Sequence, residues 1–445
     1  MFSFERFRTF NLQSNQHSIS VTRILASAFN AVDPGVAVKK YLDEYSLPNS
    51  QRVFAFGLGK AAAAMTTALA NEIKLTDTLI ITKHALLFEP STDSELHLDS
   101  AAIIEGDHPI PGNSSLAAGN AAINFISRLT KDDLLVCLIS GGGSSLMAAP
   151  HIPLAELQLL TSSLLSCGAR IDEINIIRRH IDQLKGGGLA RIAASRGAQI
   201  VSLILSDVVS DSLESIASGP TAPDPTTNAD VQLIIEKYQL KDQVSIFIPK
   251  FLVESLKPGD PIFERIQNTI IASNKIALVA AKIQAQKEGF RTFIISTELQ
   301  GEASNVGREI ASHLKESLQT IQRPFCMLAG GETTVTLRHS SGQALKANGK
   351  GGRNQELALA AVDVLAGLQD VMLVSIATDG EDGPTDAAGA VVTGQTAQRA
   401  ESLRMSAADY LSRNDAYNFF GALDDLIRTG PSGTNVNDLV ICFAF

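Results

Sequence analysis

Glycine-rich loops flanked by cations are the part of this sequence best suited to chemistry. The segment Gly57-Leu58-Gly59-Lys60-Ala61-Ala62 follows a β-branched apolar run and precedes an alanine-rich stretch, which predicts a strand, a turn and a helix. Its spacing matches G-x-G-x-x-A, in which free amides at a helix N-terminus hold an anion. A lysine at a helix N-terminus opposes the helix dipole, so Lys60 favours contact with an anion over a solvated position.

A second glycine loop joins the apolar run 134–140 to a predicted helix, and it reads Ser140-Gly141-Gly142-Gly143-Ser144-Ser145. Consecutive glycine amides with flanking hydroxyls form a backbone nest for phosphate or carboxylate oxygens, whereas the alternative is a flexible turn. The loop is not G-x-x-x-x-G-K-[ST], because no lysine follows. It also differs from G-x-S-x-G, the turn that presents a nucleophilic serine.

Two further charged segments follow in the N-terminal half. Lys185 precedes three glycines and ends a basic stretch that holds Arg178, Arg179 and His180. This pattern fits a charge clamp and equally a helix stop, since cations satisfy a helix C-terminus. Asp207 follows the predicted strand 200–206, where an acid can serve as a general base, a cation ligand or a helix N-cap.

The C-terminal half holds a second set of cations among glycines. Lys350 and Arg353 lie in the segment GKGGR before an amphipathic stretch. An arginine at the start of a helix does little to stabilise that helix, whereas its planar guanidinium suits carboxylate or phosphoryl oxygens. Thr434 and Asn435 precede the last predicted strand, where they can hydrogen-bond a ligand or form a turn.

Acidic residues also gather in this half. Glu332 follows Gly331 in a glycine turn, and Asp379 and Asp386 belong to a carboxylate-rich loop after the predicted strand 371–378. Oxygen ligands of this kind suit a divalent cation, and the alternative is a solvated acidic loop.

Short β-branched runs alternate with longer alanine-rich amphipathic stretches, which predicts an α/β fold made of two α/β domains. The N-terminal domain is expected to be Rossmann-like, with a parallel sheet covered by helices on both faces. Parallel sheets bind ligands beyond the carboxyl ends of their strands, which is where the glycine loops fall. The strands expected in this domain are 53–56, 78–82, 134–140 and 200–206.

Proline-rich segments at 219–227 and 249–261 indicate a domain break. We expect a leader over 1–17, an N-terminal domain over 18–265, and a C-terminal domain with a mixed sheet over 266–445. The strands 325–329 and 333–337 are expected to form an antiparallel pair, because only three residues separate them. The other strands expected in the C-terminal domain are 269–273, 292–296, 371–378 and 439–443.

Composition narrows the function classes. The chain has 445 residues and a net charge of −10, and this acidic balance argues against a nucleic-acid or anionic-membrane partner. No apolar stretch approaches the roughly 18 residues of a spanning helix. The four cysteines lie far apart without CxxC spacing, which argues against a zinc site or a disulfide framework. We expect small-molecule substrates and a monomer or homodimer.

The first 32 residues contain a single acid, Glu5, and three arginines among many polar residues. This composition is compatible with a mitochondrial presequence, and the alternative is an irregular leader before a first helix near residue 18. A cytoplasmic location is expected, with a mitochondrial one as the second option.

Several long segments together resemble the glycerate 2-kinase family with its C-terminal MOFRL domain. The resemblance extends from about Ser20 through nearly the whole chain. It implies ATP-dependent phosphorylation of the 2-hydroxyl of D-glycerate, with Mg²⁺, in a cleft between two α/β domains. The segments are GLGKAA, GDHPIPG, ISGGGSSLM, IRRHIDQLKGGGLA, LILSDVVSD, ASGPTAPDPTT, LAGGETTV, GKGGRNQELALA, ATDGEDGPTDAAGA and GTNVNDL.

The resemblance also assigns roles. Lys60 and Arg353 are expected to stabilise the transferred phosphoryl group, since phosphoryl transfer depends on positioning and charge neutralisation. Separately from the resemblance, we expect Asp207 to be the base that orients the 2-hydroxyl and Lys185 to act as a second charge clamp. The loop 140–145 would hold phosphates or the glycerate carboxylate. The magnesium shell is expected to come from Glu332, Asp379 and Asp386. The remaining expected contacts are Gly57, Gly59, Asn274, Gly331, Lys350, Thr434 and Asn435.

Two other functions remain open. An NAD(P)-dependent hydroxypyruvate reductase is suggested by the G-x-G-x-x-A turn and by Lys83, which could pair with an NADP 2′-phosphate. Against it, the strand that ends at Lys83 and His84 lacks the acid that would hold a ribose. The third function is a non-catalytic module that binds sugar phosphates, because a fold alone does not fix an activity.

Overall fold

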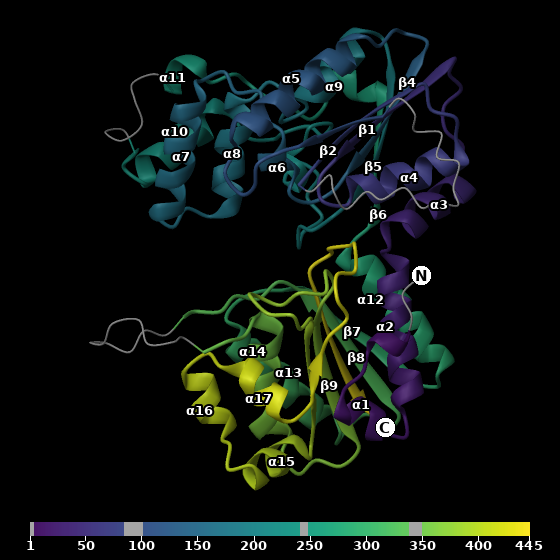
Figure 1. Cartoon of the computed structure of the whole chain (residues 1–445), viewed down its shortest axis with the longest axis vertical. Coiled ribbons are helices and arrows are strands. Elements are labelled where there is room, and N and C mark those ends of the chain that lie inside the picture. The colour runs from purple at the N-terminus through teal and green to yellow at the C-terminus, as the bar shows by residue number, and fades with distance from the viewer. Residues whose placement is uncertain (1–3, 84–100, 241–247, 338–348) are drawn as a thin grey trace. The chain divides into compact units, whose positions relative to one another are not determined.

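The structure is a computed structural model that describes residues 4–83, 101–240, 248–337 and 349–445. The chain forms two compact units. The parallel-sheet unit comprises Pro34–Ile271, and the mixed-sheet unit comprises Met1–Asp33 together with Ala272–Phe445. Both units combine a sheet with helices, so the predicted α/β class with two domains is confirmed (Figure 1). His84, expected at a strand end, lies outside the described residues.

The parallel-sheet unit is built on a six-stranded sheet in the order β3-β2-β1-β4-β5-β6. The pairs β1–β2, β2–β3, β1–β4 and β4–β5 are parallel. Its strands are β1 (Arg52–Leu58), β2 (Asp77–Thr82), β3 (Ala101–Glu105), β4 (Asp133–Ile139), β5 (Gln199–Leu205) and β6 (Ile266–Ala272).

Helices cover both faces of this sheet, α3 and α4 on one and α5 and α9 on the other (Figure 1). The helices are α3 (Pro34–Glu44), α4 (Ala62–Glu72), α5 (Asn113–Ser127), α6 (Gly143–Leu146), α7 (Leu154–Ser166), α8 (Ile171–Ile181), α9 (Gly188–Ser195), α10 (Asn228–Lys237) and α11 (Ile248–Phe251), with short 3₁₀ turns η3 (Ile216–Ser218) and η5 (Pro261–Arg265).

The composition of β4 explains its position in the middle of the parallel sheet. Every residue of β4 is buried, as expected for a continuous apolar run covered by helices on both faces. Its one charged residue, Asp133, pairs with Arg52 at the amino-terminal edge of the sheet. A separate apolar cluster holds α7, α8 and α10 together, and this cluster fixes the position of the basic residues on α8.

The mixed-sheet unit has the strand order β11-β10-β9-β12-β8-β7. The pair β7–β8 is parallel, while β12 is antiparallel to both β8 and β9, which confirms the expected mixed sheet. The strands are β7 (Arg291–Leu299), β8 (Phe325–Gly331), β9 (Val371–Ala377), β10 (Gly389–Thr393), β11 (Leu426–Ile427) and β12 (Asp438–Ala444).

Helices α2 and α12 lie on one side of the mixed sheet and α13 and α14 on the other (Figure 1). The helices are α1 (Phe10–Ser14), α2 (Ser18–Ala31), α12 (Asn274–Lys287), α13 (Ala303–Ser317), α14 (Arg353–Leu365), α15 (Thr396–Ser402), α16 (Ala407–Ser412) and α17 (Ala416–Ala422), preceded by the 3₁₀ turn η1 (Phe4–Arg6).

One predicted strand pairing is wrong. The segment 333–337 is not a strand, and only Thr334 pairs, through an isolated parallel bridge to Glu302. The glycine turn does not reverse the chain, because the amide of Glu332 donates to Leu299 O and that of Thr334 donates to Gly301 O. The β-branched residues of this segment therefore follow the loop after β7.

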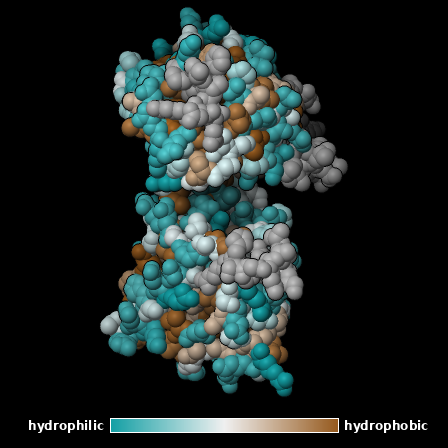
Figure 2. Space-filling view, turned by 90° about the vertical axis from the view of Figure 1, so that its left-hand side faces the viewer, coloured by the Kyte–Doolittle hydropathy of each residue, from teal (hydrophilic) through white to brown (hydrophobic). Residues whose placement is uncertain are grey.

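The surface of both units is largely polar on the face shown in Figure 2, where small groups of hydrophobic residues are scattered among hydrophilic ones. Among the described residues, no helix is both long and apolar enough to cross a membrane. Cys137, Cys326 and Cys442 are buried, Cys167 is exposed, and all four thiols are free.

The residues before α2 pack onto the mixed-sheet unit. Phe7 is buried against Phe29, and their rings are 5.4 Å apart. Asn11 donates from its backbone amide and its side chain to the buried Asp425, at 3.0 and 2.8 Å. The sequence division had placed 18–33 with the N-terminal domain and 1–17 apart from both, whereas in the structure 1–33 joins the C-terminal unit.

We predict that Asn11→Ala lowers the free energy of unfolding by about 1–2 kcal/mol, because buried Asp425 loses the side-chain donor of Asn11 while it keeps the backbone amide of residue 11 and Arg399. Burial raises the pKa of Asp425 to about 6. The folded state therefore holds a proton that the unfolded state releases near pH 4, and stability from this group falls as pH rises through 6. The loss in Asn11→Ala should thus be larger at pH 8 than at pH 5 in urea unfolding. Exposed Gln13→Ala is the control. An equal decrease in the free energy of unfolding for the two variants would show that the Asn11–Asp425 hydrogen bond does not stabilise the fold.

Candidate active site

The carboxyl-terminal edge of the parallel sheet brings together residues from four loops. Lys60 follows β1, His108 follows β3, Gly141 and Gly142 follow β4, and Asp207 follows β5. A Cβ built on Gly141 would lie 1.8 Å from Asp207 Oδ2, and one built on Gly142 would lie 3.4 Å from both Lys60 Cγ and Cε. The two glycines therefore let the carboxylate and the lysine stem pass directly over the loop.

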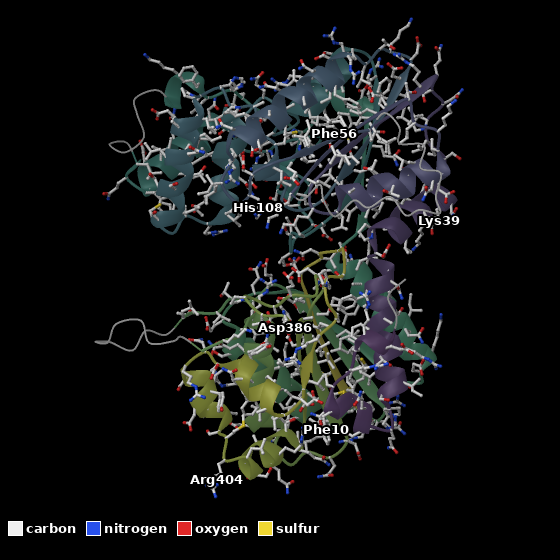
Figure 3. All side chains as sticks on the ribbon, in the orientation of Figure 1. Phe10, Lys39, Phe56, His108, Asp386 and Arg404 are labelled. Carbon is white, nitrogen blue, oxygen red and sulfur yellow. The ribbon has the colours of Figure 1, made fainter. Side chains whose placement is uncertain are left out.

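His108 completes this group from the loop before α5 (Figure 3). Its Cδ2 would lie 3.7 Å from a Cβ on Gly142. Burial lowers the pKa of His108, and the charges of Lys60, Lys83 and Arg178 lower it further. The ring is therefore neutral at pH 7, within reach of three cations that come from separate elements.

The second glycine loop has open amides. Among the described residues, the amides of Gly141, Gly142, Gly143 and Ser144 have no hydrogen-bond acceptor. Four consecutive N–H groups without an acceptor form the kind of nest that holds a phosphate or carboxylate oxygen. Lys60 also has no ion-pair partner in the described part of the chain, and its side chain is exposed.

The first glycine loop is different, and this corrects one expectation. Gly59 N donates to Ile81 O, Lys60 N to Gly141 O, and Ala61 N to Ser140 Oγ. These amides are thus used within the protein and are not available to an anion. The glycines serve packing instead: Gly59 has φ +118° and its Cα faces Ser140, while Gly57 lies against the Thr66 hydroxyl.

The serines of the second loop divide in the same way. Ser140 Oγ accepts from Ala61 N, and Ser145 Oγ donates to Gly142 O. Ser144 Oγ lies 2.7 Å from Ser218 Oγ, and Ser218 in turn donates to Asn175 Oδ1 on α8. Ser144 therefore links the open amides to α8.

Lys185 is not a free charge clamp. Its Nζ lies 2.7 Å from Asp182 Oδ2 and donates to Met147 O, and both side chains of the pair are almost fully buried. Asp182 also accepts from the amides of Ala149 and Leu184. The pair is locally satisfied, so Lys185 holds the chain rather than offering an unpaired charge.

Burial raises the pKa of Asp207, and the charge of Lys60 opposes this rise. A carboxylate with a raised pKa accepts a proton more readily than one in water, which suits a group that orients a hydroxyl. The parallel-sheet unit therefore provides an open oxygen-binding loop, an unpaired lysine and a carboxylate within one small region.

Arg353 is the cation of the mixed-sheet unit that was expected to contact the phosphoryl group, and it lies on a helix that packs against β9 and β10. It begins α14, with Nε 2.5 Å from Asp438 Oδ2 and Nη2 3.1 Å from Asp438 Oδ1. Its Nη1 lies 2.9 Å from Glu332 Oε1. These partners raise the pKa of the guanidinium, although burial alone would lower it. Arg353 is thus held by two carboxylates, and the side chain remains about one third exposed.

Asp382 occupies the N-terminus of α14. Its carboxylate accepts from Asn354 N at 3.0 Å and from Gln355 N at 2.8 Å. Burial and the neighbouring Asp438 raise its pKa to about 6, against the effect of these two donors. The helix start is therefore capped by the protein itself and is not an open anion site.

The acids expected to hold magnesium do not form a site. Among the described residues, no group of three His, Cys, Asp or Glu side chains is arranged to hold a metal ion. Glu332 pairs with Arg353, and Asp386 pairs with Arg428 and accepts from the Tyr417 hydroxyl. Asp379 accepts from the amide of Glu381 in a local turn. The three residues thus have separate local roles.

The other expected contacts of this unit also have local partners. Lys350 Nζ lies 4.0 Å from the centre of the Tyr417 ring. Thr434 donates to Val32 O, and Asn435 Oδ1 accepts from Asn437 N. Asn274 donates to Val436 O and Asp438 O, while its buried Oδ1 has no partner among the described residues. Gly331 has φ +148°, which lets β8 pass close to Leu299.

Three residues that lie in or beside these sites were not predicted as site residues from the sequence. His108 lies in GDHPIPG, and Asp438 in GTNVNDL, both of which carried the family resemblance. Arg178 had been noted only as part of a basic stretch. Asp438 could have been identified from its position, because it is a charged residue between a predicted turn and a predicted buried strand.

Two family models match the chain. A model described as a domain of unknown function (DUF4147) matches residues 20–252, and the MOFRL family matches residues 325–438. The D-glycerate 2-kinase of Thermotoga maritima is 38% identical over 425 residues, which cover 94% of this chain and 96% of that protein. The glycerate 2-kinase of Pyrococcus horikoshii is 36% identical, with 94% and 95% coverage. A protein of Agrobacterium vitis named "Putative hydroxypyruvate reductase" is also 36% identical, with 94% and 92% coverage.

Solved structures agree with the sequence matches. The crystal structure of a glycerate kinase from Thermotoga maritima superposes with a TM-score of 0.86 at 36% identity, covering 96% of this chain and 99% of that one. A Pyrococcus horikoshii protein superposes with a TM-score of 0.82 at 34% identity, covering 97% and 99%.

Proposed function

Because the chain belongs to the glycerate 2-kinase family and is therefore a phosphotransferase, we propose that it transfers the γ-phosphoryl group of ATP to the 2-hydroxyl of D-glycerate. The products would be 2-phospho-D-glycerate and ADP. The observation that supports this most is the open loop of Gly141–Ser144 amides. Lys60, which has no ion pair with a described residue, and the partly buried Asp207 lie against its glycines.

The chemistry of these groups fits phosphoryl transfer. The transferred group carries negative charge on its non-bridging oxygens, so its transition state is stabilised by aligned N–H donors and cations. Lys60 and the open amides would supply these in the parallel-sheet unit, and Arg353 would supply the guanidinium of the mixed-sheet unit. We propose that catalysis occurs in a cleft between the two domains, where both sets act on the same phosphoryl group.

Magnesium enters this proposal as part of the MgATP substrate. The carboxylates expected to form a resident shell have other partners, so the described residues do not fit a preformed magnesium site. The ion carried by ATP would offset the phosphate charge, while Glu332, Asp379 and Asp386 keep their local partners.

The reductase alternative loses support from the first glycine loop. A dinucleotide pyrophosphate needs open amides at the start of the helix after β1, and the amides of Gly59, Lys60 and Ala61 are already bonded within the protein. The strand β2 is followed by Lys83 rather than by an acid that could hold a ribose.

A coupled assay separates these functions. The kinase predicts ADP release that depends on both D-glycerate and MgATP, with 2-phosphoglycerate as the product identified by ³¹P NMR. Oxidation of NADPH or NADH with hydroxypyruvate, without glycerate-dependent ADP release, would support the reductase instead. Tight binding of sugar phosphates without turnover in either assay would support the non-catalytic module.

Asp207→Asn is predicted to lower kcat about 10- to 100-fold, because the amide cannot accept the proton of the 2-hydroxyl. Burial raises the pKa of Asp207, so wild-type activity should fall as pH decreases through that raised value. The variant should lack this acidic limb of the pH profile. Asp211→Asn, on the same loop, is the matched control, and an unchanged acidic limb in Asp207→Asn would refute the assignment.

A further inference from the structure

Arg178 is a buried cation that forms no ion pair with any described residue, although the charge of Asp182 acts on it from a greater distance. Its side chain lies in the last turn of α8 with 9% of the residue exposed, and its Nε has no hydrogen-bond partner. The neighbouring Arg179 is also buried, but it forms a 3.0 Å ion pair with Asp224 and donates to Glu214 O. Buried charges are normally paired, so the difference between these adjacent arginines requires an explanation.

The guanidinium faces a small cavity. Arg178 lines it together with Ser144, Asp182 and Lys185, and the remaining walls are Pro111, Leu157 and Ile181. Lys185 is neutralised by Asp182 at 2.7 Å. Asp182 also acts on Arg178, from beyond ion-pair distance. One carboxylate thus faces two cations, so the wall of the cavity carries one uncompensated positive charge, and Arg178 is the cation without an ion pair.

The cavity adjoins the groups proposed to carry out the reaction. Ser144 belongs both to the cavity wall and to the run of open amides after β4. Its hydroxyl is held by Ser218, which has a left-handed φ of +59° and connects to Asn175, one turn before Arg178 on α8. After burial, the charges of Lys60 and Arg178 both lower the pKa of His108, so this ring lies near both cations. Arg178 is therefore near the Lys60 end of the site but separate from it.

We propose that the carboxylate of the acceptor substrate binds at the mouth of this cavity, with Arg178 as the residue that binds it. The cavity itself, about 10 Å³, has room for about one water molecule. The inference rests on the proposed kinase function and deepens it, because it names the group by which the acceptor is selected. A planar guanidinium with free N–H donors matches a carboxylate in charge and geometry.

A carboxylate fits better than a nucleotide phosphate for two reasons. The cavity is small and partly apolar, and a single uncompensated positive charge matches a monoanion rather than the multiple charges of a triphosphate. Anchoring the carboxylate also restrains the hydroxyl on the adjacent carbon most strongly. This gives a physical reason for reaction at the 2-hydroxyl of glycerate rather than at the 3-hydroxyl.

The kinetic test compares Arg178→Met with wild type, using D-glycerate and its neutral amide, D-glyceramide, as acceptors. The KM for D-glycerate should rise about 100-fold in the variant, as expected when one partner of a buried charged contact is removed. The KM for MgATP should stay within about twofold. The preference for D-glycerate over D-glyceramide should fall by a similar factor, because wild type alone distinguishes them through the carboxylate.

Thermal unfolding with D-glycerate alone provides a readout that does not depend on turnover. D-glycerate should raise the Tm of wild type but not that of Arg178→Met, since only the protein that binds it is stabilised. Without D-glycerate the variant should be at least as stable as wild type, because it removes an unpaired buried charge. Arg196→Met, at an exposed position of the same unit, should behave as wild type in every measurement.

The outcomes distinguish this inference from the proposed function. Absence of glycerate-dependent ADP release in wild type would refute the kinase, while the Tm measurements would still decide the carboxylate site. An equal D-glycerate effect on the Tm of wild type and Arg178→Met, or no effect on wild type, would overturn the inference. So would an active enzyme in which Arg178→Met raises the KM for MgATP and leaves that for D-glycerate unchanged.

Discussion

Replacing Lys60 with alanine is expected to lower kcat for D-glycerate phosphorylation by about 100- to 1,000-fold. The side chain is exposed and has no ion-pair partner among the described residues, so the change removes a cation without leaving a buried acid unpaired. Its stem passes over Gly142, beside the open amides that would bind the same oxygens. The loss should therefore appear in kcat, because developing charge on the phosphoryl group is stabilised mainly in the transition state.

The control for this variant is Lys74→Ala, an exposed lysine of the same unit that should leave kcat unchanged. The thermal midpoints of both variants should match wild type. Lys60→Arg keeps the charge at a different geometry and should recover part of the activity. Near-normal turnover in folded Lys60→Ala would show that this lysine does not contact the transferred group.

Replacing Arg353 with alanine is expected to reduce kcat by a similar 100- to 1,000-fold and, unlike the Lys60 variant, to destabilise the protein. Asp438 is buried and would lose its bidentate partner, at an expected cost of about 2–3 kcal/mol. Burial raises the pKa of Asp438, and loss of Arg353 would raise it further. An acid whose pKa is higher in the folded state makes the protein less stable as pH rises, so the loss should be larger at pH 8 than at pH 5.

A second substitution separates the two effects of Arg353→Ala. Adding Asp438→Asn removes the unpaired buried charge, so the double variant should regain stability but not activity. Exposed Arg404→Ala (Figure 3) is the control and should change neither quantity. Recovery of activity together with stability would indicate that Arg353 is a structural residue only.

Combining Lys60→Ala with Arg353→Ala tests whether the two cations act on one phosphoryl group. Residues that stabilise the same transition state give a combined loss smaller than the product of the single losses. A fully multiplicative loss would indicate that they act independently.

Local patterns in the sequence predicted most of the fold. Nine strands, β1, β2, β4, β5, β6, β7, β8, β9 and β12, overlap the runs that the sequence pattern identified. The strands β3, β10 and β11 were missed, since they are short and carry no strong run of their own. The segment 333–337 was mistaken for a strand because its β-branched residues satisfy the local pattern, whereas its hydrogen bonds are made with the distant loop after β7.

The candidate site was predicted less evenly. Glycine clusters indicated where backbone approaches closely, and this was correct for both loops of the parallel-sheet unit. The sequence does not identify the group that packs against each glycine. Ser140 lies against Gly59, and the Asp207 carboxylate lies against Gly141. A glycine that accommodates a neighbouring loop and one that faces an open binding region have the same local signature.

The sequence by itself determined the α/β class, the order of the elements and the residue types at the ends of the strands. These depend on interactions between near neighbours, which periodicity and turn chemistry report. Only the tertiary structure decided which polar groups remain available for binding. Arg178 and Arg179 are adjacent and chemically identical, yet Arg179 reaches Asp224 while Arg178 faces a cavity. That distinction is set by contacts between residues far apart in the chain, so local pattern carries no information about it.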